Sequence, residues 1–283
     1  MTAGQAEPSA EPFFLKTGTG QRFCLFHPPS GVCRGAVLYV PPFAEEMNRS
    51  RRIAALQARQ LSLLGYGVLQ LDLYGCGDSS GDFGDARWDI WKEDLAAGAH
   101  WLTQRLDQPL TLWGLRLGAL LALDYARTAS HAISAMVLWQ PVLAGPAYLT
   151  QFLRLRTVGA LLSDATSEHT GTAALRAALQ AGNMLEISGY DLAPALAAAI
   201  DALAPLENFT PPCPVHWFEA LGSPDQSISP GAARASAAWR AREVDLTLHA
   251  VHCPPFWTTP EITVCSAWLA ATSAALRKPG NGH

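Results

Sequence analysis

Five short segments of the sequence hold the side chains that are best able to do chemistry. They contain two adjacent carboxylates, a cysteine between glycines, an arginine between apolar residues, and an aspartate with a more distant histidine: Glu45 and Glu46, Cys76, Arg116, Asp225 and His252. Histidine and carboxylates transfer protons, thiolates attack carbonyl carbons, and arginine binds anions. Each segment comes after a short apolar run. We therefore expect all of them at one edge of a sheet, where ligands of open α/β sheets bind.

The apolar runs themselves predict a mostly parallel sheet. They are nearly continuous and rich in β-branched and aromatic residues, as expected of strands that are covered on both faces. Six of them occupy residues 36–40, 67–71, 110–113, 135–139, 215–218 and 244–248. Amphipathic stretches at residues 49–64, 90–105 and 117–129 separate the first four runs, and this alternation predicts a doubly wound α/β fold. Residues 22–27 predict an antiparallel edge strand, because no helix separates them from the next strand.

The pattern changes after residue 144. Residues 145–211 contain no good strand and are rich in alanine, which favours helices. We expect a helical cap insert there, lying over the carboxyl edge of the sheet as a lid, with plain structural packing as the alternative. Residues 20–144 and 212–277 then form the core, and residues 1–19 form a disordered leader.

Length, charge and cysteine use narrow the class of protein. A chain of 283 residues can form one domain with a large core, and its 20 basic and 24 acidic residues provide no basic face for nucleic acid. The six cysteines form no C-x-x-C pair. His249, His252 and Cys253 lie close together but have no second ligand cluster, so we expect no metal and no other cofactor.

Membrane and secretory classes are also disfavoured. The longest apolar stretch, residues 110–123, is broken by Arg116 and is shorter than the roughly 20 residues that a membrane span needs. The first residues lack the basic and apolar regions of a secretory signal. We therefore expect a cytoplasmic protein without a transmembrane segment. The sequence leaves open whether it forms a homodimer.

Three motifs in order carry a resemblance to a known superfamily. The stretches PPFAEEMN, LDLYGCGDSSGDF and LWGLRLGAL, followed by the insert and then by an aspartate and a histidine, resemble the α/β-hydrolase superfamily over about residues 20–275. More narrowly, the wording of these motifs resembles the second class of hydrolases associated with the exosortase A system, which are found near exopolysaccharide gene clusters in Gram-negative bacteria. The resemblance implies an α/β-hydrolase fold with a cap.

The sequence departs from that superfamily at the residue in the middle of the turn that normally holds the nucleophile. α/β-Hydrolases hold a nucleophilic serine on a sharp turn between a strand and a helix. Here Gly114 and Gly118 preserve the small residues of the turn, but Arg116 occupies the central position. A guanidinium is always protonated and has no lone pair for attack, so acyl transfer through this position is excluded.

The rest of the superfamily's apparatus has counterparts in this sequence. The resemblance implies that His252 is the base and that Asp225 orients it. It also implies that the backbone N–H groups of Leu117 and Phe43 form an oxyanion hole.

Three interpretations of Arg116 stay open. In the first, the histidine and aspartate activate water directly, while Arg116 binds a carboxylate or phosphate of the substrate or stabilises an oxyanion. In the second, the nucleophile has moved to Cys76. In the third, Arg116 pairs with Glu45 or Glu46 and fills the old pocket, which leaves a binding module without catalysis. The two glutamates also suit the solvated start of a helix.

Tryptophans near the strand ends are candidates for the walls of a cleft. Trp113, Trp139, Trp217 and Trp257 all occur there and could contact an apolar chain. Packing in the core is the alternative explanation for each of them.

These observations predict a hydrolase that acts on an ester, thioester or related acyl substrate with an anionic group. The narrower resemblance implies a link to exopolysaccharide metabolism. One alternative is a catalytically silent homologue that binds a small anionic ligand or a partner protein. Another is a lyase or decarboxylase that uses His252 as base and Arg116 as a carboxylate clamp.

Overall fold

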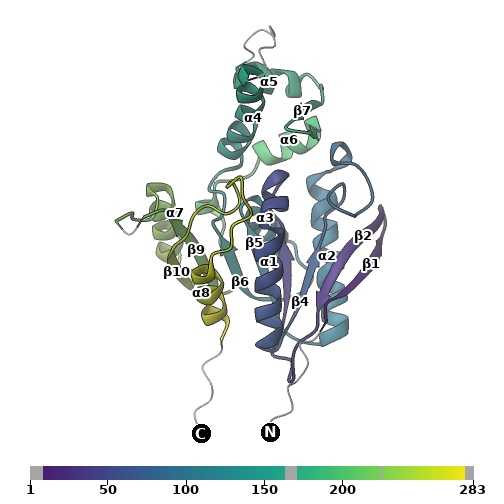
Figure 1. Cartoon of the computed structure of the whole chain (residues 1–283), viewed down its shortest axis with the longest axis vertical. Coiled ribbons are helices and arrows are strands. Elements are labelled where there is room, and N and C mark those ends of the chain that lie inside the picture. Colours follow the sequence, from purple (N-terminus) through teal and green to yellow (C-terminus); the bar gives the residue numbers. More distant parts are fainter. Residues whose placement is uncertain (1–8, 163–170, 224, 278–283) are drawn as a thin grey trace.

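The computed structural model describes residues 9–162, 171–223 and 225–277. The strands of its main sheet are β1 (Glu11–Thr17), β2 (Gly20–His27), β3 (Gly35–Val40), β4 (Tyr66–Leu71), β5 (Leu110–Leu115), β6 (Ile133–Trp139), β9 (Val215–Leu221) and β10 (Leu246–His252). Their order across the sheet is β1-β2-β4-β3-β5-β6-β9-β10 (Figure 1). The strands from β4 to β10 are parallel, whereas β2 runs antiparallel to both β4 and β1. The expected doubly wound, mostly parallel fold is therefore confirmed.

Helices cover both faces of this sheet. The helices of the core are α1 (Glu45–Leu63), α2 (Trp88–Leu106), α3 (Leu117–Ala126), α7 (Pro230–Ala241) and α8 (Ser266–Leu276), with a short 3-10 helix η1 (Phe83–Asp85) before α2. α1 and α8 pack in one apolar cluster, while α2, α3 and α7 pack in the cluster on the opposite face. This double coverage explains why every residue of β3 and β5 is buried.

The insert lies at the carboxyl ends of the parallel strands (Figure 1). It contains α4 (Gly145–Leu162), α5 (Thr172–Gln180), β7 (Leu185–Ile187), β8 (Tyr190–Leu192), α6 (Pro194–Asp201) and a 3-10 helix, η2 (Leu206–Asn208). The expectation that it contains no strand is wrong for β7 and β8, which form a hairpin. Its two turn residues, Ser188 and Gly189, have φ angles of 52° and 84°, and such a turn matches the twist of a hairpin. Strands of three residues are too short for a recognisable apolar run.

The amino-terminal part of the chain differs from the expected leader of residues 1–19. β1 pairs with β2 over its whole length, so it is the edge strand and β2 lies inside the sheet. The ring of Phe13 stacks on Trp101 of α2 with 4.6 Å between centroids, which anchors β1. This strand gives little signal in the sequence, because its apolar residues have polar neighbours and none of its side chains is fully buried. Residues 1–8 of the expected leader lie outside the described residues.

The last strand is displaced from its predicted position. Residues 244–248 were expected to form it, but β10 extends from Leu246 to His252. His252 is therefore the final residue of the strand and does not follow it. β10 lies at the edge of the sheet and most of its residues are partly or fully exposed, so its polar side chains do not signal the end of the strand.

A buried ion pair fixes the turn after β4 to the rest of the core. Arg22 Nε lies 2.6 Å from Asp94 Oδ1, with both side chains almost completely excluded from solvent. The backbone N–H of Tyr74 donates to the second oxygen, Asp94 Oδ2, over 2.8 Å. The pair thus joins β2, α2 and the turn that contains Cys76.

We predict that Asp94→Asn strongly destabilises the protein, because Arg22 would keep its charge in the core without a counter-charge. Removal of one partner from a buried pair costs about 3–5 kcal/mol. Urea unfolding followed by circular dichroism measures this loss. The control is Glu11→Gln, which breaks the exposed pair between Arg105 and Glu11 and should cost at most about 1 kcal/mol. Equal costs in the two variants would contradict the prediction.

Candidate functional site

The turn from β5 to α3 has the sharp geometry of a nucleophile elbow, with an arginine at its tip. Arg116 has φ 55° and ψ −119°, a left-handed conformation that is unfavourable for a side chain of this size. A Cβ atom at Gly118 would lie 2.3 Å from the Pro41 carbonyl oxygen, and one at Gly114 would lie 2.6 Å from the Ala119 Cα. The two glycines therefore allow the close approach that the turn requires.

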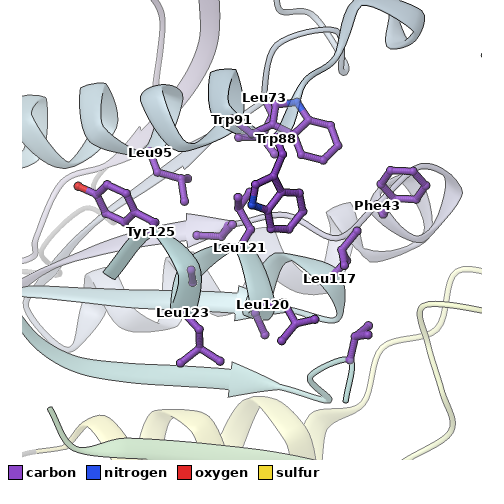
Figure 2. Packing of buried hydrophobic residues seen from close by; sticks show 14 of the residues in the cluster. Phe43, Leu73, Trp88, Trp91, Leu95, Leu117, Leu120, Leu121, Leu123 and Tyr125 are labelled. Atoms are coloured by element: carbon purple, nitrogen blue, oxygen red, sulfur yellow. The ribbon is translucent and has the colours of Figure 1, made fainter. Parts of the chain in front are cut away.

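The second strained loop lies beside the elbow, between β3 and α1. Ala44 has φ 51° and precedes the first residue of α1. Phe43 in this loop and Leu117 at the start of α3 lie next to one another among apolar side chains, including Leu73, Trp88 and Trp91 (Figure 2). These residues surround a void of only about 10 Å³, which is enough for about one water molecule.

The proposed oxyanion donors have one feature that suits the role. Leu117 is the first residue of α3, where backbone N–H groups have no partner within the helix. The backbone of Phe43 lies in the loop that faces this helix end. Their action as an oxyanion hole stays a prediction.

The Arg116 guanidinium is paired with Glu46 from the first turn of α1. Arg116 Nε donates to Glu46 Oε1 over 3.2 Å, and Nη1 donates to the Gln140 carbonyl oxygen over 3.4 Å. Only 13% of the Arg116 side chain and 15% of the Glu46 side chain are exposed. The arginine is therefore a largely buried cation with a direct counter-charge.

Two aromatic rings complete the surroundings of this pair. Trp257, in the chain after β10, has its ring centroid 5.3 Å from the Arg116 guanidinium carbon, and the Tyr148 ring of α4 lies at 5.8 Å. Both distances allow a cation–π interaction. The Tyr148 hydroxyl also donates to Glu46 Oε2 over 3.0 Å. Segments that are far apart in the sequence thus converge on one charge.

Burial changes the acid strength of the groups in this cluster. It raises the pKa of Glu46 above 4.5, while the positive charge of Arg116 and the hydrogen bond from Tyr148 act in the opposite direction. Burial also raises the pKa of Tyr148 well above its usual value, and the neighbouring Glu46 adds to this effect. Tyr148 therefore keeps its proton and acts as a hydrogen-bond donor to the carboxylate.

A cavity of about 280 Å³ opens above the cluster, between the core and the insert. Its lining comes from α1, α4, the hairpin and the chain after β10, and includes Phe43, Glu45, Glu46, Arg49, Tyr148, Gln151, Phe152, Leu155, Ser188, Trp257 and Thr258. Apolar and aromatic walls with a few convergent polar groups are typical of a small-molecule site. Arg116 lies directly behind three of these residues, Glu46, Tyr148 and Trp257.

The structure places the predicted base and its orienter away from this cavity. His252 and Asp225 are both exposed, and no hydrogen bond joins their side chains in the described parts of the chain. Neither lines the cavity. They do share one edge of the sheet, because His252 is opposite Leu221 and Asp225 is in the loop that follows. Their catalytic roles stay predictions.

Two other candidates have ordinary structural surroundings. Glu45 forms an ion pair of 3.5 Å with Arg49 and accepts a hydrogen bond of 3.2 Å from the Tyr190 hydroxyl. Cys76 lines the small apolar void beside the elbow. Burial, with a contribution from nearby carboxylates, raises the pKa of the Cys76 thiol to about 12, which leaves very little thiolate at neutral pH.

Of the tryptophans expected near a cleft, Trp257 alone lines the cavity. Trp113 and Trp139 have no exposed surface and pack against each other with ring centroids 4.7 Å apart. Trp217 is buried in the opposite apolar cluster against Trp239. The physical reason is that successive residues of these strands face the two helical layers and not the end of the sheet.

Tyr148 is the site residue that the sequence does not reveal. It lies in the alanine-rich insert, where no motif distinguishes it from other packed aromatic residues.

Within residues 9–162, 171–223 and 225–277, no group of three or more His, Cys, Asp or Glu side chains is arranged to hold a metal ion. The helices of the same residues include none with the length and apolar character to cross a membrane.

Comparisons with known proteins agree with the fold. The family model described as "Serine aminopeptidase, S33", of the α/β-hydrolases, matches residues 32–200, which is more than half of the chain. No curated protein matches the sequence.

Several solved structures have a similar fold. One is Est1E from Butyrivibrio proteoclasticus with bound ferulic acid, with a TM-score of 0.62, 13% identity and coverage of 93% of this chain and 95% of that one. A carboxyl esterase from Bacillus coagulans has a TM-score of 0.58 and 15% identity, with coverage of 86% and 90%. A serine hydrolase without a lid from Xanthomonas campestris has a TM-score of 0.54 and 15% identity, with coverage of 94% and 91%.

At these identities the similar structures support the fold alone. The residues that the family model matches include both the elbow and the loop before α1. The chain therefore belongs to the serine aminopeptidase S33 family of α/β-hydrolases.

Proposed function

We propose that this protein hydrolyses an acyl substrate, an ester or thioester with an anionic group, by direct attack of water. The observation that carries the proposal is the cavity of about 280 Å³ beside the elbow, with the buried carboxylate of Glu46 in its wall and the paired cation of Arg116 behind that carboxylate. The arginine cannot form an acyl intermediate, so water must attack the acyl carbon itself.

The elbow also suggests how the substrate would be oriented. Its backbone directs the start of α3 toward the loop of Phe43, so an acyl carbonyl near this junction could accept hydrogen bonds from Leu117 and Phe43. The small apolar void next to them suits a short end of the acyl group. The aromatic walls of the larger cavity suit the remainder of the substrate.

The narrower resemblance extends this proposal to the biological setting. The motifs around Phe43, Cys76 and Arg116 resemble the second class of hydrolases associated with the exosortase A system. We therefore propose that the substrate is a compound of exopolysaccharide metabolism.

A second candidate is a silent homologue that binds a small anionic ligand. It is favoured by the pairing of Arg116 with Glu46 and by the absence of His252 and Asp225 from the cavity lining of the described residues. In this case the pair is a structural remnant that fills the position of the nucleophile.

We predict that the purified protein releases acid from at least one member of a panel of short acyl esters, acyl thioesters and half-esters of dicarboxylic acids. In water labelled with ¹⁸O, one labelled oxygen should enter the acid product, which mass spectrometry detects. A half-ester should be hydrolysed faster than its methylated neutral analogue. Release of carbon dioxide or an aldehyde without label would instead identify a lyase. No turnover above the rate in buffer would favour the silent homologue.

We also predict that Arg116→Met is destabilised more at pH 8 than at pH 5. Without the cation, burial should raise the pKa of Glu46 further above 4.5. A carboxyl whose pKa is higher in the folded state favours folding at low pH, and this contribution is lost as the pH rises through the folded pKa. The extra loss at pH 8 should be about 1–3 kcal/mol in urea unfolding.

The matched control for this prediction is the double variant Arg116→Met with Glu46→Gln. It contains no buried carboxylate, so most of the difference between the two pH values should disappear. An equal loss of stability in Arg116→Met at pH 5 and pH 8 would contradict a charged pair at the elbow.

A further inference from the structure

We propose that Glu46 is the general base of the site and takes the proton of the attacking water. This inference rests on the proposed function and assigns its central proton transfer to a residue other than the expected histidine. Three observations support it: the place of Glu46 in the cavity wall, the hydrogen bonds to its carboxylate, and its pairing with the cation at the elbow.

The carboxylate of Glu46 is held in place but keeps free acceptor positions. Oε1 accepts from Arg116 Nε over 3.2 Å, and Oε2 accepts from the Tyr148 hydroxyl over 3.0 Å. A carboxylate oxygen can accept about two hydrogen bonds, so each oxygen retains one lone-pair position. Because Glu46 lines the cavity, a water molecule there can donate to it.

The proposed reaction balances without any further reactant. An O–H bond of water breaks and its proton moves to the Glu46 carboxylate, while the oxygen electron pair forms the bond to the acyl carbon. The carbonyl π electrons move to the substrate oxygen. Collapse of this intermediate breaks the bond to the leaving group, which takes the proton from Glu46. The products are a carboxylic acid and an alcohol or thiol.

The ion pair connects this proton transfer to stabilisation of the oxyanion. Before the reaction, the charge of Arg116 is compensated by Glu46 at 3.2 Å. When Glu46 becomes protonated, the guanidinium loses its counter-charge at the moment when negative charge develops on the substrate oxygen. The cation therefore favours the transition state more than the bound substrate, as catalysis requires.

The alternatives for the base are less well placed. Glu45 lines the same cavity, but 47% of its side chain is exposed, compared with 15% for Glu46. His252 is exposed and does not line the cavity. Among the described residues that line this cavity, Glu46 is therefore the carboxylate that is largely buried.

The pH dependence of the reaction should reflect the charges that face Glu46. Arg116 and Tyr148 contact it, and Glu45 and Arg49 line the same cavity. Burial keeps the pKa of Glu46 above 4.5, so kcat/KM should rise with pH across an acidic limb as the carboxylate ionises. Arg116→Met should shift this limb to higher pH, because the cation that favours the ionised form is absent.

The test uses the acyl substrate that the wild-type protein hydrolyses best. Loss of a general base lowers kcat by roughly 100-fold or more, so we expect this loss in Glu46→Gln. Added formate should restore part of the rate to Glu46→Ala, because the small carboxylate can occupy the vacated space. Glu45→Gln is the matched variant, and it should retain at least about tenfold more activity than Glu46→Gln. Urea unfolding confirms that each variant is folded.

The outcomes separate this inference from the proposed function. If the wild type is active but Glu46→Gln keeps more than a tenth of its rate, or formate restores nothing to Glu46→Ala, Glu46 is not the base. The same conclusion follows if His252→Ala loses more activity than Glu46→Gln. An inactive wild type overturns the proposed function, and the role of Glu46 falls with it.

Discussion

The charge of Arg116 is the constraint on which the arrangement of the site depends. A cation at the tip of the elbow is 13% exposed, and a largely buried charge is costly unless an opposite charge and hydrogen bonds accompany it. The chain meets this need with Glu46 from α1, Gln140 after β6, and the rings of Tyr148 and Trp257. Four separate segments are thereby tied to one residue.

This constraint also explains the position of the insert and of the chain after β10. Tyr148 connects α4 to α1 through Glu46, and its ring lies against the guanidinium. Trp257 approaches the same cation from the carboxyl end of β10. A serine at position 116 would make neither contact. The same three side chains that surround the cation form part of the cavity wall, so the charge at the elbow and the shape of the cavity are coupled.

The sequence predicts the core of this structure well because the central strands are covered on both faces and are therefore apolar throughout. The apolar runs that became β3, β4, β5, β6 and β9 are continuous, and the elbow is marked by Gly114 and Gly118. β1 and the hairpin of β7 and β8 were missed, since short or half-exposed strands have little apolar pattern. The end of β10 was missed for the same reason. His252 is therefore the last residue of this strand, although the sequence predicts it in the loop after the strand.

The candidate site was predictable only in part. The pairing of Arg116 with a glutamate was one of the interpretations that the sequence left open, because a buried cation requires a counter-charge. Which of the two glutamates pairs with Arg116 depends on how α1 begins, at the strained Ala44, and the contribution of Tyr148 depends on packing of the insert.

The charged pair of Glu46 and Arg116 is tested most directly by a titration of Glu46, followed by carbon-13 NMR of its carboxyl group. We expect a pKa of Glu46 above 4.5 that rises further when Arg116 is replaced by methionine. A pKa of 4.5 or lower, or one that does not respond to the substitution, would contradict a buried ion pair at the elbow.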